Sequence, residues 1–458
     1  MTIQAHEFVL RPRTGLPRSS RAPLGLGGTG PGETVMLSSV EQYGITWYFD
    51  GEYECGQYCN GDWFVVGPVT ITSITPESEE VDGRWMNGSE LNPPSSGQGY
   101  DSNTASRIPY SHETNVAPSV AGALTLEEGS IVSSISDPNP SSETQPIYML
   151  AILTVVTEAP PAGAFRPPPY IEDKTSSWSE SQLDYSILQS LPSTSSAPND
   201  LSALSETALK FWNEQGSNWT GAYVMATHAG SGYGRDLATR TNTMALALHL
   251  DFTNSEKRNL FIGLVQYGID NYGRILRGGN WHADGGWHHG RKVPTLMAGL
   301  ALNDPNILYW VKRRYIGDPS YAGEGDTRNL FQEDGTTFIV SESDVGRPTE
   351  EEFPSHATWE EERVYLEEDV GNPEWGIRYW QVGREWADRR WGASYRFTGS
   401  QFVGLSLAAR MMNGGYDAWD WPPFFEYVER YLDVGPLEGI SAFHQEMWND
   451  YNEQFKEE

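Results

Sequence analysis

The densest group of residues able to do chemistry lies in the segment 278–294, GGNWHADGGWHHGRKVP. Three of the nine histidines, His282, His288 and His289, fall within this short segment, together with five glycines. The other polar and aromatic members are Asn280, Trp281, Asp284, Trp287, Arg291 and Lys292. Glycine lets the backbone approach a ligand closely, and loops that carry imidazole, carboxylate and guanidinium groups are seldom mere connections. We therefore expect the main functional site here.

Three chemistries compete for this segment. In an acid–base site that requires no cofactor, His288 or His289 would move a proton while Arg291 or Lys292 holds an anionic group. In a divalent-metal site, the ligands would be His282, Asp284 and His288, although their spacing matches no helix-face motif and a fourth ligand must come from elsewhere. In a purely structural role, the imidazoles and indoles would tie a long loop together by hydrogen bonds.

A second group, HAGSGYGRD at 228–236, contains His228, Tyr233, Arg235 and Asp236 just before a predicted helix. The backbone amides there could meet an anion at the helix N-terminus, with Arg235 contacting it. The GSGYG stretch lacks the Lys-Ser/Thr of a phosphate loop, and no strand precedes it, so nucleotide binding is not expected. A glycine-rich entry into the helix is the alternative.

The third group, at 368–396, alternates five arginines with tryptophan and tyrosine. Aromatic faces pack against sugar rings, and guanidinium groups bind carboxylate or sulfate through two parallel hydrogen bonds. The combination favours an anionic polysaccharide, and its expected substrate-binding residues are Trp375, Arg378, Tyr395 and Arg396. Single-stranded nucleic acid could use the same alternation, and a packing seam between helices is a further alternative.

The overall charge limits the partners. The chain has 458 residues, with 31 Lys plus Arg against 62 Asp plus Glu, and a net charge of −31. Such a surface repels nucleic acid and anionic membranes, so neither is expected as a partner. It suits a saline, marine environment in which charge repulsion is screened. The longest aliphatic stretch, 147–156, is far shorter than the roughly 20 residues of a membrane span.

Turn-forming residues and the spacing of apolar residues divide the chain into four parts. Residues 1–34 form a basic, Pro/Gly-rich arm, either disordered or lying on a neighbouring subunit in a homo-oligomer or virion. Short β-type segments at 43–49, 62–74, 130–136 and 147–156 predict an antiparallel β-sandwich over 35–159. A Pro/Ser-rich linker follows at 160–200. The two cysteines, Cys55 and Cys59, fit small strand residues or one local bridge.

Helical periodicity begins near Leu201 and continues to the end of the chain. Apolar residues recur at three- and four-residue steps, Ser255 is the expected N-cap of a long helix, and Pro422 with Pro423 opens another at its first turn. These features predict an α/α toroid-like helical domain over 201–458. The fold class is therefore multidomain, with a β-sandwich followed by helices.

With these expected domains and the His/Arg/Tyr/Trp content of the three groups, the chain resembles polysaccharide lyases that combine an α/α toroid with a β-sandwich. The resemblance implies β-elimination at a uronic acid of an anionic polysaccharide. Asn280, Arg291 or Arg378 would stabilise charge at the carboxylate, and a base would remove the neighbouring proton. The candidate bases are His288, His289 and Tyr233. Trp281, Trp287, Lys292 and Arg235 would contact the substrate.

Two alternatives stay open beside the lyase. The sandwich precedes the toroid here, and the start MTIQAHEFVLRPR shows no signal peptide. A non-enzymatic virion protein, such as a tail or spike component, would need no such signal, so the expected location is extracellular or virion-associated. A glycoside hydrolase is the second alternative, with Asp284 and Glu374 as its carboxylates.

Overall fold

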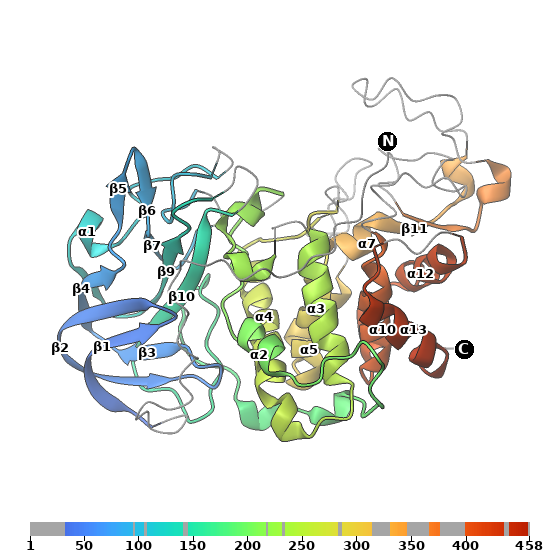
Figure 1. Cartoon of the computed structure of the whole chain (residues 1–458), viewed down its shortest axis with the longest axis horizontal. Helices are drawn as coiled ribbons and strands as arrows, with labels where there is room; N and C mark the ends of the chain where they lie inside the picture. Colours follow the sequence, from blue (N-terminus) through green and yellow to red (C-terminus); the bar gives the residue numbers. More distant parts are fainter. Residues whose placement is uncertain are drawn as a thin grey trace.

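The chain begins with β-strands and continues with helices, so the structure mixes α and β (Figure 1). The computed structural model describes residues 33–94, 97–104, 108–140, 145–216, 219–230, 234–282, 286–313, 330–345, 366–375, 399–434 and 439–456. In this part of the chain the strands of the large sheet precede most of the helices, as predicted, although α1 lies among these strands and β11 and β12 lie among the helices. The limits of the four predicted domains stay predictions.

Eight strands form one curled sheet in the order β7-β9-β10-β3-β2-β4-β8, and β1 pairs with β2 outside this path. Neighbouring strands run antiparallel except β10 and β3, which are parallel. The strands are β1 Val35–Gln42, β2 Ile45–Gln57, β3 Trp63–Val66, β4 Val69–Thr75, β7 Ser89–Leu91, β8 Leu124–Leu126, β9 Gly129–Ser136 and β10 Ile147–Val156. A separate hairpin pairs β5 Glu79–Val81 with β6 Arg84–Met86, and α1 covers Pro118–Ala121.

Strand β10 is buried along nearly its whole length because both of its faces are covered. Side chains alternate between the two faces of a strand. Ala151, Leu153 and Val155 belong to the core inside the curled sheet. Leu150 and Ile152 belong to a second cluster that includes residues of the helical part. The continuous apolar run of β10 therefore indicates a strand between two cores.

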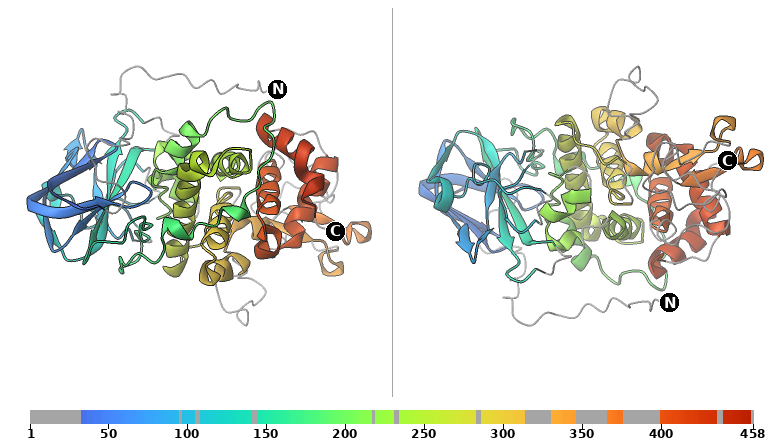
Figure 2. Two further views of the ribbon diagram at one scale, coloured as in Figure 1. Left: turned by 90° about the horizontal axis from the view of Figure 1, so that it is seen from below. Right: turned by 90° about the horizontal axis from the view of Figure 1, so that it is seen from above.

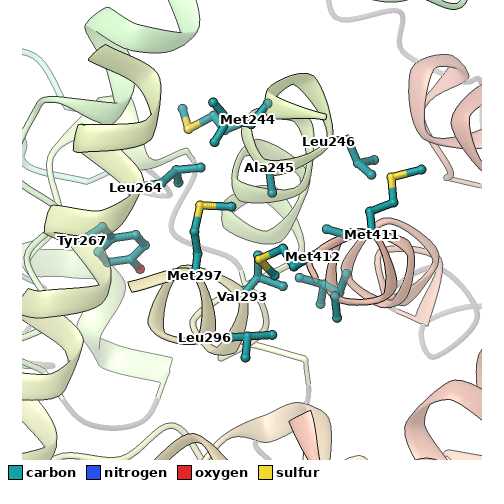
Figure 3. Close-up of a cluster of buried hydrophobic side chains, with 14 of the residues drawn as sticks. Met244, Ala245, Leu246, Leu264, Tyr267, Val293, Leu296, Met297, Met411 and Met412 are labelled. Atoms are coloured by element: carbon teal, nitrogen blue, oxygen red, sulfur yellow. The ribbon is translucent and has the colours of Figure 1, made fainter. Parts of the chain in front are cut away.

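Most of the remaining regular structure is helical (Figure 2). They are α2 Ser202–Ala208, α3 Gly234–Leu248, α4 Asn254–Leu276, α5 Lys292–Ala301, α6 Pro305–Lys312, α7 Gln332–Thr336, α10 Phe402–Met411, α11 Gly415–Trp419, α12 Pro422–Val434 and α13 Ala442–Tyr451. A short ribbon pairs β11 Thr337–Ile339 with β12 Pro373–Trp375. Side chains of α3, α4, α5 and α10 meet in one apolar cluster with Met412, the residue after α10 (Figure 3).

Sequence signals at the helix ends are partly confirmed. Helix α12 begins at Pro422, as expected. The N-cap of α4 is Thr253, and the prediction of Ser255 was wrong. The Thr253 hydroxyl accepts the amide of Glu256, whose carboxylate accepts the Thr253 amide in return. This reciprocal capping box satisfies two amide donors at once, which a cap at Ser255 would not do.

Buried charges join the sheet to the helices. Arg166, in the predicted linker, donates to Asp62 over 2.6 Å and to Asp270 of α4 over 2.5 Å. All three side chains are almost fully buried. Asp62 directly precedes β3, so a single guanidinium connects the strand region with α4. Buried charges are retained only when they are paired in this way.

Two smaller expectations concern the cysteines and the membrane. Cys55 and Cys59 are both buried and both free thiols, so the local bridge does not form. Burial raises the pKa of the Cys55 thiol to about 12, which leaves it protonated. None of the helices in the described ranges combines the length and the apolar character that a membrane crossing requires.

Candidate functional site

The glycine-rich segment 278–294 connects the end of α4 to the start of α5 and packs directly on α3. A Cβ on Gly234, the first residue of α3, would lie 2.3 Å from the backbone carbon of Trp287. Gly290 has a φ of +93° and touches the backbone of Ala238. Glycine is required at both positions because only a bare Cα allows this approach. The second predicted group, 228–236, is thereby held against the first.

Residues 330–334 anchor the segment from the other side. Four residues of this stretch contact, in sequence order, four positions of the segment. They are Trp281 N to Leu330 O (2.7 Å), His288 N to Gln332 Oε1 (2.7 Å), Gly290 N to Glu333 Oε1 (2.8 Å), and Lys292 Nζ to Asp334 Oδ1 (2.7 Å). The order of the two stretches therefore fixes the path of the glycine-rich backbone.

His282 and His288 lie in contact, with ring centroids 5.5 Å apart. The Nδ1 of His288 is 2.7 Å from the carbonyl oxygen of His282, which can only accept. The Nδ1 of His282 is 2.8 Å from Asn280 Oδ1. With the amide oriented in this way, both neutral rings carry their proton on Nδ1, and Nε2 is the basic nitrogen. Asn280 then directs its Nδ2 donors away from His282.

His289, by contrast, is a weak base. Its ring is fully buried and packs edge-on against Phe402, with centroids 4.7 Å apart. Burial lowers its pKa to about 3, and the neighbouring His288 and Arg291 add to the shift. A group with so low a pKa stays neutral at pH 7 and has little driving force for taking a proton. His289 remains a predicted base; His288 is buried as well, at 3% exposure, and its Nδ1 is held by the His282 carbonyl oxygen.

Arg291, near the end of the segment, is held by Glu214. Its Nε donates to Glu214 Oε1 over 2.9 Å, and the guanidinium also donates to the carbonyl oxygens of Trp287 and His289. Glu214 also accepts the Tyr267 hydroxyl and the Trp281 indole. The predicted roles of Arg291 and Trp281 at a substrate stay untested, and both side chains have these partners inside the protein.

Lys292 has a similar environment. Its ammonium lies 2.6 and 2.7 Å from the two carboxylate oxygens of Asp334 and 2.9 Å from the Trp419 carbonyl oxygen. It also lies 4.5 Å from the centroid of the Trp419 ring. Burial lowers its pKa, and Asp334 opposes that shift. The ion pair with Asp334 attaches the start of α5 to α7, and the hydrogen bond to Trp419 attaches it to α11.

Glu333 is a residue that the sequence did not single out. Its side chain is fully buried, and burial raises its pKa to about 7, with the charge of Asp334 adding to the rise. Oε1 accepts the Gly290 amide, whereas Oε2 has no hydrogen-bond partner in the described structure. The same holds for the nearby Gln332 Nε2. A carboxyl that titrates near neutrality beside the segment can act as an acid or a base.

The other predicted residues divide into two sets. Arg235 lies in the first turn of α3, half-buried, 3.3 Å from Asp236, and Trp287 is half-buried in the segment itself. Trp375 is the last residue of β12, and Glu374 beside it is buried against Arg430. Outside the described residues lie the predicted base and metal ligand Tyr233 and Asp284, the predicted substrate contacts Arg378, Tyr395 and Arg396, and most of the arm 1–34.

The structure thus joins the first two predicted groups and leaves the third largely outside the described residues. His228 packs edge-on against Trp212, with centroids 5.3 Å apart, and burial lowers its pKa to about 3. Trp212 stacks on Tyr267, which binds Glu214. In the described ranges, no three His, Cys, Asp or Glu side chains are grouped as metal ligands. The metal site stays a prediction, because Asp284 lies outside these ranges.

Comparison with known proteins adds no relative. No family model, no curated protein and no solved structure matches this chain.

Proposed function

We propose that the protein cleaves an anionic polysaccharide by β-elimination at a uronic acid, with the segment 278–294 as its active site. The observation that carries the proposal is the contact of His282 and His288, whose Nδ1 atoms are both held by oxygen acceptors. That arrangement makes Nε2 the basic nitrogen of each ring. The aromatic and arginine residues of 368–396 are proposed to extend the site along the sugar chain.

In the proposed reaction, His288 Nε2 takes the proton from the carbon next to the uronate carboxylate. The electron pair of that C–H bond becomes a carbon–carbon double bond, and the bond to the departing sugar oxygen breaks. The departing oxygen takes a proton from solvent water and leaves as a hydroxyl, and His288 returns the abstracted proton to solvent to complete the cycle. Asn280 Nδ2 donates to the carboxylate, on which negative charge accumulates as the proton departs.

Arg291 is proposed to position the site rather than to contact the sugar. Its guanidinium binds Glu214 and the carbonyl oxygens of Trp287 and His289, and so holds the backbone on either side of His288. Lys292 is proposed to do the same at the start of α5 through Asp334. The curled sheet and the helices are proposed counterparts of a β-sandwich and an α/α toroid, and the proposed location is extracellular or virion-associated.

Glu333 favours a second candidate, glycoside hydrolysis. A general acid for glycosidic cleavage needs a raised pKa, and burial gives Glu333 a pKa of about 7. The second carboxylate would be Asp284 or Glu374. In this reaction water is added across the broken bond, and no double bond forms.

The two reactions leave different products, and one assay separates them. The protein is incubated with alginate, pectate, ulvan and sulfated glycans, and the absorbance of unsaturated uronate and the number of reducing ends are followed together. Elimination raises both signals, whereas hydrolysis raises reducing ends alone. No change in either signal with any substrate would contradict both proposals.

A further inference from the structure

Near the C-terminus of α6, a patch combines exposed aromatic and cationic side chains; we call Tyr309, Trp310, Lys312 and Arg313 the α6 patch. Tyr309 is 57% exposed, which is unusual for so large a side chain. Trp310 is half-buried beside it, with ring centroids 5.6 Å apart and planes at 80°. The two rings therefore present a face and an edge at one place on the surface.

The Arg313 guanidinium of the α6 patch is held in place by its aromatic neighbours. The guanidinium carbon of Arg313 lies 4.9 Å from the Trp310 ring centroid and 5.8 Å from that of Tyr309. Arg313 Nη1 also donates to the Tyr309 hydroxyl over 3.0 Å. Lys312, beside it in the sequence, is exposed. A guanidinium held on aromatic faces loses less conformational freedom when it binds an anion.

The α6 patch is continuous with the proposed active site. Trp310 packs on a buried cluster formed by Ile275, Trp281, Leu330 and Phe331. Trp281 belongs to the segment 278–294, and Leu330 accepts its backbone amide. The ring of Trp281 stacks on Phe331 with centroids 5.5 Å apart and planes at 12°. A single layer of aromatic side chains thus separates the surface of the α6 patch from the segment.

Charge indicates what the α6 patch binds. In a chain with a net charge of −31, Lys312 and Arg313 place two cationic side chains directly beside an exposed ring. The aromatic face suits the C–H face of a sugar, and the fixed cation suits a carboxylate. We propose that the α6 patch is an outer subsite that binds a uronate residue of the same polysaccharide, away from the bond that is cleaved. This inference rests on the proposed function.

The test uses the variants Tyr309→Ala and Arg313→Ala in the full chain. Tyr48→Ala is the matched control, because Tyr48 is an exposed tyrosine on strand β2 of the sheet. KM and kcat are measured with the polyuronate that the wild type cleaves, and binding is measured as retardation in a gel containing alginate or pectate. We expect KM to rise about tenfold in both patch variants with kcat nearly unchanged, since an outer subsite contributes binding rather than chemistry. Tyr48→Ala should match the wild type.

The outcomes separate the subsite from the reaction. Cleavage with wild-type KM and wild-type retardation in both patch variants would overturn the subsite and leave the lyase proposal standing. Retardation without cleavage in the wild type, lost in Tyr309→Ala, would support the subsite and overturn the lyase proposal. Neither retardation nor cleavage with any polyanion would overturn both. If only Arg313→Ala has a lower melting temperature, the KM and retardation of Tyr309→Ala, whose ring is mostly exposed, test the subsite: wild-type values overturn it, and raised KM with reduced retardation supports it.

Discussion

Arg291 and Glu214 form a buried ion pair, with Arg291 Nε 2.9 Å from Glu214 Oε1 and side chains that are 5% and 2% exposed. The two residues come from different parts of the helical region, since Glu214 follows α2 and Arg291 precedes α5. Tyr267 and Trp281 donate to the same carboxylate. The ion pair therefore joins the glycine-rich segment to α4 and to the chain after α2.

Replacing Arg291 by Met should destabilise the fold strongly. Removing one partner leaves the Glu214 charge buried without compensation, which costs about 3–5 kcal/mol in proteins. Urea denaturation measures the free energy of unfolding. Arg277→Met is the control, because Arg277 is half exposed and lies 3.9 Å from the exposed Glu172. Equal free energies of unfolding for the two variants would show that the buried pair contributes no more to stability than the exposed one.

His288→Gln should lower kcat by about 10²- to 10⁴-fold with little change in KM, because the proposed base is lost while the sugar contacts remain. Glutamine is close in size and can keep a hydrogen bond to the His282 carbonyl oxygen. His112→Gln is the control, since His112 is exposed on the sheet part. A His288→Gln protein with near-wild-type kcat and an unchanged melting temperature would remove His288 from the mechanism.

Asn280→Asp should separate the two roles of this side chain. Aspartate can still accept from His282 Nδ1, so the orientation of that imidazole is kept. It lacks the Nδ2 donors and would repel a uronate carboxylate. Loss of one such donor costs about 10²- to 10³-fold in kcat. Asn280→Ala, which loses both roles, is the comparison, and full activity of Asn280→Asp would contradict the role proposed for Nδ2.

The raised pKa of Glu333 predicts how the stability of the fold depends on pH. Its pKa of about 7 in the folded protein lies above the ordinary value of 4.5 because of burial. The folded state therefore binds the proton more tightly than the unfolded state, and this contribution to stability is complete below about pH 4.5. It is lost as the pH rises toward 7. Wild-type stability should thus fall between pH 5 and pH 8 by about 1–3 kcal/mol more than that of Glu333→Gln.

The comparison isolates one carboxyl, because Glu90 and Asp270, whose pKa values are also raised by burial, are present in both proteins. Glutamine keeps an oxygen for the Gly290 amide and places an amide where Oε2 has no partner. Identical pH dependence of the two proteins would show that Glu333 does not titrate in this range. If the wild type releases reducing ends without unsaturated uronate, and Glu333→Gln abolishes that release, the hydrolase becomes the better candidate.

The four predicted β-type segments and the helical character of the later part of the chain could be predicted because their signals are local; the short strands β5 to β8, β11 and β12 were not predicted. The apolar run of β10 and the spacing of Leu237, Met244 and Leu248 in α3 reflect which faces are buried. The N-cap of α4 was misplaced because serine ranks above threonine as an N-cap when residue type alone is considered. The pairing with Glu256 decides for Thr253, and the T-x-x-E spacing of Thr253 and Glu256 is a capping-box signal in the sequence itself.

The candidate site could be predicted only where its residues are neighbours in the sequence. The histidines of 278–294 are conspicuous together, whereas Glu214 and Glu333 lie far from them along the chain and have no motif of their own. Their roles arise from burial beside Arg291 and Gly290, a long-range property without local periodicity. The glycines at 234 and 290 carried a usable signal, since paired glycines in two polar loops can indicate close backbone contact.

Removal of divalent metal distinguishes the two roles predicted for the histidine pair His282 and His288, which are acid–base catalysis and metal binding. If Asn280 Nδ2 binds the uronate carboxylate and His288 is the base, dialysis against a chelator should leave kcat unchanged. The hydrogen bonds at both Nδ1 atoms would equally suit metal ligands, whose second nitrogen is commonly held by an oxygen. Elemental analysis showing one metal per chain, lost together with activity on chelation, would contradict the metal-free mechanism. A parallel loss of metal in Asp284→Asn would then identify the third ligand, because the predicted metal site takes its carboxylate from Asp284 beside the two imidazoles.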